Sequence, residues 1–282
     1  MSRIVLVTDS SADLPAAVVA GGGVCVVRAQ YAFDEHTFSD GEQTPGEIYA
    51  RMNRDGRAPR PFGAPEAAFR EAFRAVLGAG DEPLCVVTPF DVNPSFTTAV
   101  AAQLSIDEAA FKVVNGGVGS AGLCALVTSL LAGVRAGWDR DQVLDALDRL
   151  APQCDTLFVP ADVTWLERAG RLPLVEDKIG AVGDGCPVVR AGTRITGIAL
   201  EDTREGALAE AVDRAGARVE AGQRVVVVIV HATDAPLAAK VEAMMRERWP
   251  VAQVVVTELS ATIGAQVGPG AVGIGVAPAV EL

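Results

Sequence analysis

The sequence has few of the residues that enzymes use as bases. Only two of its 282 residues are histidines: His36 in an acidic stretch and His231 at the end of an apolar run. A serine or cysteine nucleophile needs a base beside it, and neither histidine lies in a pattern that supplies one. His231 is better explained as a hydrogen-bonding residue at a strand end. The missing bases favour a binding protein over an enzyme, and we assign no catalytic residue.

Cysteines are also sparse. The five occur singly, without a Cys-x-x-Cys motif or a histidine at metal-ligand spacing: Cys25, Cys85, Cys124, Cys154 and Cys186. This spacing argues against the common zinc motifs, so we expect no metal. An odd number of cysteines without a recognisable signal peptide is typical of the reducing cytoplasm, where we expect the protein to reside.

Positive charge and long apolar runs are scarce as well. Lys and Arg number 24 against 36 Asp and Glu, a formal net charge of −12. Nucleic-acid binding relies on basic side chains that neutralise phosphates, so we expect no nucleic acid partner. The longest weakly polar run, residues 118–134, contains glycine, serine and threonine and lacks aromatic or basic flanks. It predicts a core helix and no transmembrane segment.

The length and apolar content predict two domains. A chain of 282 residues exceeds the usual size of one core, and 50% of it is hydrophobic. The alternation of strand and helix patterns becomes less regular after Ala151 and Pro152. We therefore predict an N-terminal α/β domain of residues 1–152 and a C-terminal α/β domain of residues 153–282.

The first residues predict a strand that ends in a polar crevice. Residues 4–7 are four consecutive apolar residues, typical of a strand buried on both faces of a parallel sheet. Just beyond this strand's predicted carboxyl end, where open α/β sheets bind ligands, come four polar residues: Thr8, Asp9, Ser10 and Ser11. Asp13 is predicted to cap a following helix whose first turn contains Pro15.

The strand and helix patterns predict the fold class. Apolar runs at Ile4, Val24, Leu84 and Phe111 alternate with helical patterns. This alternation predicts an α/β fold with a mainly parallel, Rossmann-like sheet and helices on both faces. A second, smaller α/β domain should follow, with the ligand between the two.

Local signals add further elements. Residues 188–190 and 195–200 predict a hairpin, and capping boxes predict helices beginning after Thr44 and Asp139. Two stretches predict no regular structure: an acidic segment over residues 31–43 and a loop over residues 57–65 that its prolines hold extended.

A phosphotransferase is one interpretation of the polar crevice. Phosphoaspartyl hydrolases of the haloacid type carry a second aspartate two residues after the nucleophile, where it acts as the acid. Ser11 stands two residues after Asp9 in this chain. We therefore expect Asp9 to be structural or ligand-orienting.

Residues 117–122 match a dinucleotide-binding fingerprint between a predicted strand and helix. That fingerprint requires an acidic residue at the tip of the next strand, but residues 139–142 form a capping box that opens a helix. Because neither that strand nor a paired mononucleotide-binding half is present, we expect no cofactor.

Three segments resemble, in order and spacing, the motifs of one family. They are residues 8–15 (Thr-Asp-Ser-Ser-Ala-Asp-Leu-Pro), the Gly170-Arg171-Leu172 segment after residues 165–169, and the glycine-rich residues 263–273. All three are similar to motifs of the DegV family, bacterial fatty-acid-binding proteins that present acyl chains to a separate fatty acid kinase. The resemblance implies a lipid tunnel between two domains, a partner kinase that supplies the ATP site, and a place in phospholipid synthesis.

The resemblance also implies positions for the lipid head group, and several depart from the family pattern. Phe62 and Gly63 stand where the family has a threonine and a serine that help hold the lipid carboxylate. Asn93 replaces a lipid-contacting serine. Pro94 and Ser95 replace a glycine and a threonine.

Four more positions follow from the same comparison. Ser120 falls where the family has a serine. Gln266 replaces a histidine near the head group, and it can donate a hydrogen bond but cannot carry charge. Arg171 and Arg204 match family arginines, whose forked donors suit an anionic head group or an acyl phosphate.

Three hypotheses follow. The leading one is a lipid-binding protein that holds one fatty acid between its domains, with the head group near Asn93, Ser95, Gln266 and Arg171. The second is a diverged binder of another apolar anion or of a neutral lipid. The third, from a different class, is a phosphotransferase that uses Asp9.

Overall fold

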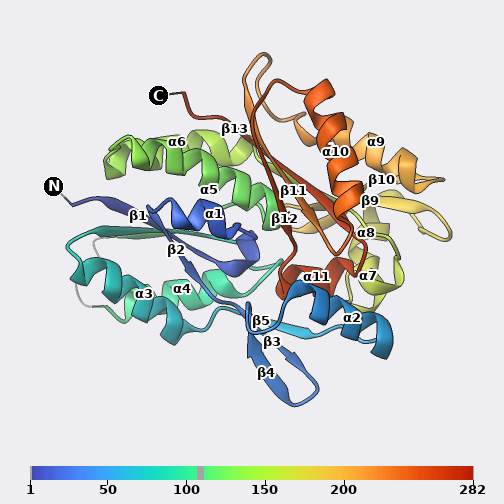
Figure 1. Cartoon of the computed structure of the whole chain (residues 1–282), viewed down its shortest axis with the longest axis horizontal. Helices are drawn as coiled ribbons and strands as arrows, with labels where there is room; N and C mark the ends of the chain where they lie inside the picture. Colours follow the sequence, from blue (N-terminus) through green and yellow to red (C-terminus); the bar gives the residue numbers. More distant parts are fainter. Residues whose placement is uncertain (1, 107–110, 282) are drawn as a thin grey trace.

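The computed structural model describes residues 2–106 and 111–281 and shows an α/β protein built on three sheets. The four-stranded sheet A and the six-stranded sheet C lie side by side, and both chain termini lie at the sheet A end (Figure 1). The predicted fold class, a parallel sheet with helices on both faces followed by a second α/β unit, is confirmed.

Sheet A is parallel, and its strand order is β2–β1–β6–β7. Its strands are β1 (Ile4–Asp9), β2 (Val24–Val27), β6 (Glu82–Val87) and β7 (Lys112–Asn115). β1 pairs with β2 on one side and with β6 on the other. The chain therefore reverses its winding direction at β1, and the carboxyl ends of β1 and β6 form the switch point where such sheets bind ligands.

Helices cover both faces of sheet A. One face carries α3 (Glu66–Gly78) and α4 (Ser95–Leu104), and the other carries α5 (Ser120–Arg135) with α6 (Arg140–Leu150) packed against it (Figure 1). Side chains alternate between the two faces of β1: Val7 joins Phe73 of α3 in one core, and Leu6 joins Leu123 of α5 in another. Burial on both faces explains the uninterrupted apolar run that predicts this strand.

Sheet C is mixed, and its strand order is β10–β9–β8–β13–β11–β12. Its strands are β8 (Asp155–Val159), β9 (Cys186–Ala191), β10 (Ile195–Glu201), β11 (Val225–His231), β12 (Val251–Glu258) and β13 (Val272–Pro278). The helices α9 (Arg204–Ala215) and α10 (Ala235–Arg248) cover one face, and α5 covers the other. The predicted hairpin is the antiparallel pair β9–β10.

The helix α5 lies between the two large sheets and contacts both of them. It confirms the predicted core helix, and within residues 2–106 and 111–281 no helix is long and apolar enough to cross a membrane. Its backbone touches β13 directly, because a Cβ placed on Gly275 would overlap the Ala121 carbonyl carbon and the Gly122 nitrogen. Since one apolar core spans the chain through α5, the boundary at residue 152 stays a prediction.

The small sheet B corrects two expectations. Its antiparallel strands β3 (Gln30–Phe33), β4 (His36–Ser39) and β5 (Arg60–Gly63) occupy stretches predicted to be irregular. The prediction over residues 31–43 was wrong because acidic neighbours mask an apolar pair, Tyr31 and Phe38, whose rings stack with centroids 5.7 Å apart. The loop prediction was wrong because β5 is an edge strand, where a proline such as Pro61 is tolerated.

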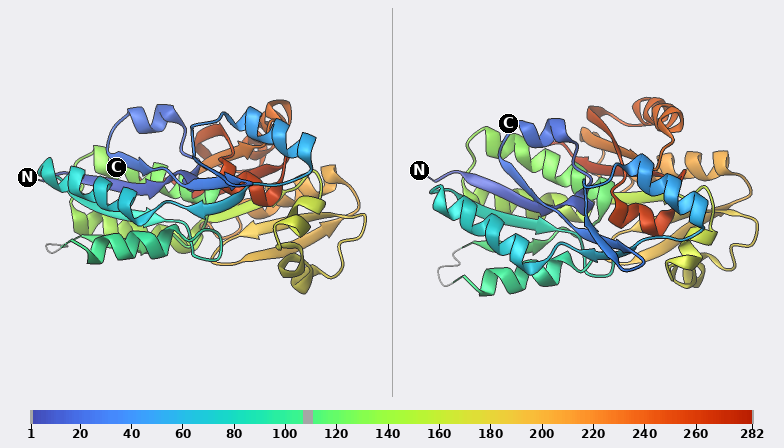
Figure 2. Two further views of the ribbon diagram at one scale, coloured as in Figure 1. Left: turned by 90° about the horizontal axis from the view of Figure 1, so that it is seen from below. Right: turned by 60° about the horizontal axis from the view of Figure 1, so that its bottom comes forward.

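The remaining elements are the 3-10 turns η1 (Ser10–Ala12) and η2 (Ala151–Gln153) and the helices α1 (Ala16–Ala20), α2 (Pro45–Asp55), α7 (Thr164–Arg168), α8 (Leu172–Ile179) and α11 (Ala261–Val267). Four of these helices lie around sheet B and the end of sheet C, namely α2, α7, α8 and α11, whereas α1 packs on β2 of sheet A (Figure 2). Both predicted capping boxes are confirmed, at Thr44 before α2 and at Asp139 before α6.

The close contact between α5 and β13 predicts a specific sensitivity. We expect Gly275→Ala to lower the free energy of unfolding by about 1 to 3 kcal/mol or more, because its methyl group overlaps helix backbone that cannot move aside alone. Gly78→Ala serves as the control, because no atom of residues 2–106 and 111–281 lies within 4 Å of a Cβ added at this helical glycine, and it should leave stability unchanged or raised. Chemical denaturation measures both, and equal stability of the two variants would contradict the expectation.

Candidate functional site

The candidate site begins where β1 and β6 end side by side. The Ser11 hydroxyl at the end of β1 lies 2.8 Å from the Thr88 hydroxyl that follows β6. The strand itself is two residues longer than predicted, so Thr8 and Asp9 are its last residues. The Thr8 hydroxyl is buried, with no hydrogen-bond partner among the described residues.

Asp9 is enclosed in protein. One carboxylate oxygen accepts hydrogen bonds from the Ser11 N–H, at 2.8 Å, and from the Ser11 hydroxyl, and the other has no partner in the part of the chain described. Burial raises the pKa of Asp9, and the hydrogen bonds from the Ser11 hydroxyl and the Ser11 N–H lower it less. A buried carboxyl that favours its protonated form is a poor nucleophile.

A second group of predicted residues lies in the loop between β6 and α4. The Asn93 side-chain oxygen accepts hydrogen bonds from the Ser95 N–H, at 2.9 Å, and from the Ser95 hydroxyl, at 2.8 Å. The same hydroxyl accepts a hydrogen bond from the Ala64 N–H at 3.0 Å. Gly63 has a φ of 74°, and a Cβ there would overlap the Asn93 oxygen, so its glycine suits this close approach. Pro94 provides the turn into α4.

The Asn93 amide nitrogen is the free donor of this loop. Because the side-chain oxygen must face the Ser95 N–H, the orientation of the amide is fixed. The nitrogen is buried and has no acceptor within the described ranges. A buried donor without an acceptor costs about 1 to 3 kcal/mol, so an incoming carboxylate or carbonyl oxygen would be stabilised there.

Arg171 and Gln266 meet from distant parts of the sequence. The Arg171 Nε donates to the Gln266 side-chain oxygen at 3.0 Å, and the Gln266 nitrogen donates to the carbonyls of Val92 and Thr262, each at 3.2 Å. All polar atoms of Gln266 are therefore used within the protein. Burial lowers the pKa of Arg171, and nearby Asp91 acts in the opposite sense. Gln266 therefore orients the Arg171 side chain, and the outer guanidinium nitrogens of Arg171 can contact a ligand.

An apolar cavity lies beside these two residues. Its volume is about 20 Å³, and apolar side chains of β8, β9, β10 and α11 line it, including Phe158, Val189, Ile195, Ile263 and Val267. Val92, the neighbour of Asn93, also lines it. Arg171 borders this cavity and two surface depressions of about 440 and 430 Å³. The apolar cavity and the protein surface therefore meet at Arg171.

The other predicted residues have different surroundings. Phe62 is 38% exposed, and the Arg60 guanidinium lies 4.7 Å above its ring. Arg204 donates to the Gly270 carbonyl and lies 3.9 Å from Asp234. Ser120 donates to Asp13. None of these four contacts involves Asn93, Arg171 or Gln266.

The backbone N–H groups of the glycine-rich segment at the start of α5 donate hydrogen bonds to other parts of the protein. The Gly119 N–H donates to the Ala191 carbonyl at 3.1 Å, and the Gly122 N–H donates to the Thr156 hydroxyl at 2.8 Å. A Cβ on Gly122 would overlap that hydroxyl. The glycines thus permit close packing of α5 on sheet C, which explains the match to the fingerprint without a phosphate.

Sequence reasoning missed the connections made by Asp13 and Asp40. The predicted helix cap at Asp13 was wrong, because α1 begins after Pro15 without a side-chain cap. Asp13 instead adopts a φ of 52° and contacts Ser120 and Ser260. The only local signal for Asp13 was its place in the first motif, and Asp40 had none.

Comparison with known proteins shows the family to which this chain is similar. A family model described as an uncharacterised protein of the DegV family matches residues 3–279. A DegV domain-containing protein of Streptomyces coelicolor is 27% identical over 283 residues, which cover 97% of this chain and 98% of that protein. A DegV domain-containing protein of Caldanaerobacter subterraneus is 20% identical over 288 residues, with 97% and 98% covered.

Solved structures share the fold. A DegV family protein of Thermus thermophilus, described as fatty-acid-binding, superimposes with a TM-score of 0.88 at 25% identity and covers 99% of this chain and 100% of its own. DegV of Bacillus subtilis, described as a fatty acid binding protein, gives a TM-score of 0.87 at 18% identity, with 99% and 100% covered. Because the family model spans nearly the whole chain and the fold agrees throughout, this protein belongs to the DegV family.

Proposed function

We propose that this protein binds one long-chain fatty acid in the cytoplasm and presents its carboxylate to a separate fatty acid kinase, without catalysing a reaction itself. The observation that carries the proposal is the buried Asn93 amide nitrogen, which has no acceptor among the described residues and follows Val92 of the cavity wall, together with Arg171 on the border of the same cavity. The Thermus thermophilus relative, described as fatty-acid-binding, supports the ligand class. Acyl phosphate formed by the kinase would then enter phospholipid synthesis.

The carboxylate needs these donors. Burying a bare carboxylate costs several kcal/mol, whereas a hydrogen bond to a charged group contributes about 1.5 to 3 kcal/mol. Asn93 supplies an N–H at the inner position, and Arg171 supplies charge-assisted N–H groups near the surface. Two or three such bonds offset the cost of burial, although the family threonine and serine are replaced at Phe62 and Gly63.

The acyl chain requires the cavity to widen. A volume of about 20 Å³ admits no more than a water molecule, whereas ligand pockets span about 300 to 1,000 Å³. The walls that must separate are α11, through Ile263 and Val267, and the β9–β10 hairpin, through Val189 and Ile195. Fatty acid binding is therefore coupled to a displacement of α11 or of the hairpin.

Native mass spectrometry of the protein purified from cells tests the ligand. The proposal expects a mass increase equal to one fatty acid, and uptake of one palmitate or oleate after delipidation. A different bound mass would favour another apolar anion or a neutral lipid. No adduct and no uptake would contradict the proposal.

Asn93→Asp should weaken fatty acid binding by at least about tenfold. The substitution keeps the oxygen that accepts from Ser95 but replaces the free N–H donor with a second, repelling oxygen. Asn115→Asp is the matched control, because Asn115 accepts from the Gly117 N–H at 2.9 Å in the same local pattern. Titration of both delipidated variants with palmitate gives the affinities, and equal affinities would place the head group elsewhere.

Arg171→Ala should reduce kinase-dependent phosphorylation more than lipid binding, because Arg171 borders the two surface depressions from which the phosphoryl group would arrive. Arg194→Ala, at an 82% exposed side chain that borders one depression, is the control. Acyl phosphate formation is measured with the kinase of the same organism and ATP. Normal turnover by the lipid-loaded Arg171→Ala variant would refute this role.

Asp9 should not become phosphorylated. Its carboxyl is fully buried and its pKa is raised, so neither access nor ionisation favours nucleophilic attack. Incubation with acyl phosphate or phosphate-ester donors, followed by mass spectrometry, should show no phosphoaspartate. Stoichiometric phosphorylation that Asp9→Asn abolishes would revive the phosphotransferase hypothesis.

A further inference from the structure

The strand β12 leaves one edge of sheet C open. It stands at the end of the strand order and is hydrogen-bonded to β11 alone. With eight residues it is the longest strand described, and residues 251–257 contain no charged residue, proline or glycine. Val256 is 42% exposed on it. A long, uncharged edge of this kind offers a row of N–H and C=O groups to a further strand.

The other sheet edges are protected. The strands β2, β4, β5 and β7, which end sheets A and B, are each four residues long. At the opposite end of sheet C, β10 has a bulge between Gly197 and Ala199, and α8 packs on it. Short strands, bulges and covering helices are common means of preventing edge pairing. The bulge of β12 lies near its first residue, at Ala252, so residues 253–258 remain in unbroken register with β11.

The regular part of β12 is self-complementary. Residues 253–257 are Gln-Val-Val-Val-Thr, with one polar residue at each end and three valines between them. When two copies of this segment are aligned antiparallel about Val255, Gln253 of each copy lies opposite Thr257 of the other. The two flanking valines also lie opposite each other. Polar pairs and pairs of β-branched residues at opposite positions stabilise antiparallel strands.

The side chains of the segment point to the faces that this alignment requires. Val254 packs against the core beneath α9 and α10, whereas Val255 belongs to the core on the α5 face. Val256 lies two residues after Val254 and therefore on the same face, where it is exposed. Pairing would cover Val256 with the less exposed Val254 of a second copy.

The backbone direction agrees with the same alignment. The Leu259 N–H donates to the His231 carbonyl of β11. Because backbone groups alternate between the two sides of a strand, the N–H and C=O groups of Val254 and Val256 point to the open edge. These two residues can therefore exchange both hydrogen bonds across the edge, and Val255 falls at a non-hydrogen-bonded position between them.

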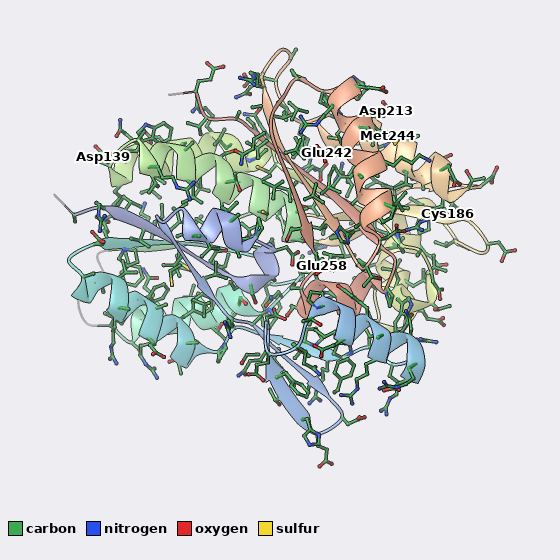
Figure 3. All side chains as sticks on the ribbon, viewed as in Figure 1. Asp139, Cys186, Asp213, Glu242, Met244 and Glu258 are labelled. Atoms are coloured by element: carbon green, nitrogen blue, oxygen red, sulfur yellow. The ribbon has the colours of Figure 1, made fainter. Side chains whose placement is uncertain are left out.

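The charges at the two ends of β12 are complementary. Glu258 is exposed at the end of β12 (Figure 3), and the exposed Arg224 donates to the Val251 carbonyl at 3.5 Å. Within the described part of the chain neither forms an ion pair. Alignment about Val255 places Glu258 opposite Ala252, beside Arg224 of the other copy. Exposed ion pairs add little stability, but they favour one orientation of the partners.

We propose that β12 pairs with β12 of a second copy of this chain, antiparallel about a two-fold axis at Val255, so that the two copies of sheet C form one continuous sheet. The same residues of both copies then form the interface, as in an isologous dimer. The dimer does not depend on the proposed function, because none of the residues that line the two depressions at Arg171 belongs to β12.

Sedimentation equilibrium tests the association. Between about 1 µM and about 1 mM protein, the average mass should rise toward twice the chain mass. Val256→Lys changes an exposed side chain and places a charge opposite Val254 at two symmetric positions, so the dissociation constant should rise at least about tenfold. Thr37→Lys is the control, exposed on the edge strand β4. A single-chain mass throughout, or equal dissociation constants for the two variants, would overturn the proposal.

Cross-linking tests the alignment. In Val255→Cys the two thiols face each other at a non-hydrogen-bonded pair, whose Cα atoms lie about 4.5 Å apart, within disulfide range. Diamide should therefore convert this variant to a covalent dimer. In Thr257→Cys the two new thiols lie about 13 Å apart along the strands and should not cross-link. The wild type, with its five cysteines, gives the background. Cross-linking of Thr257→Cys alone, or of neither variant, would contradict the proposed pairing.

Discussion

The stability of the fold depends on hydrogen-bond donors for the carboxyl groups that are buried near the end of its first strand. Asp9, Asp13 and Asp40 are each at least nine-tenths buried, and a carboxyl group buried without donors costs several kcal/mol. Asp9 finds its donors locally, in Ser11. Asp13 and Asp40 find theirs at the starts of α5 and α11. The need for donors therefore ties the first strand to the helix between the two sheets and to the helix that borders the candidate site.

The parts of the fold that were predictable are those whose signals are local. The capping box at Asp139 and the apolar run of β11 each lie within one element, and both elements form as expected. Asp13 shows why other inferences fail: its donor, the Ser260 N–H, lies 247 residues away in the sequence. From the sequence alone, an aspartate just before a helix is expected to cap that helix, so the nearest helix start was predicted as its partner. Sheet B was missed because the burial of Tyr31 depends on tertiary packing that its acidic neighbours do not reveal.

The sequence predicted which residues belong to the candidate site, but it did not predict which of their polar atoms are available to a ligand. Motif order alone pointed to Asn93, Arg171 and Gln266, and the structure connects them through the Val92 carbonyl. Which atoms remain available is decided by hydrogen bonds that no motif encodes. Gln266 uses all its polar atoms within the protein, whereas Asn93 keeps one nitrogen unpartnered among the described residues. The small volume of the cavity also follows from packing, since its walls come from β8, β9, β10 and α11.

The central claim is that a fatty acid carboxylate meets the Asn93 amide nitrogen and that its chain opens the wall formed by α11. A crystal structure of the protein loaded with palmitate tests this most directly. The account predicts a carboxylate oxygen within hydrogen-bond distance of that nitrogen, with the chain passing between Ile263 and Ile195 in a cavity far larger than about 20 Å³. A head group bound elsewhere, or a lipid held on the surface with the cavity unchanged, would contradict it.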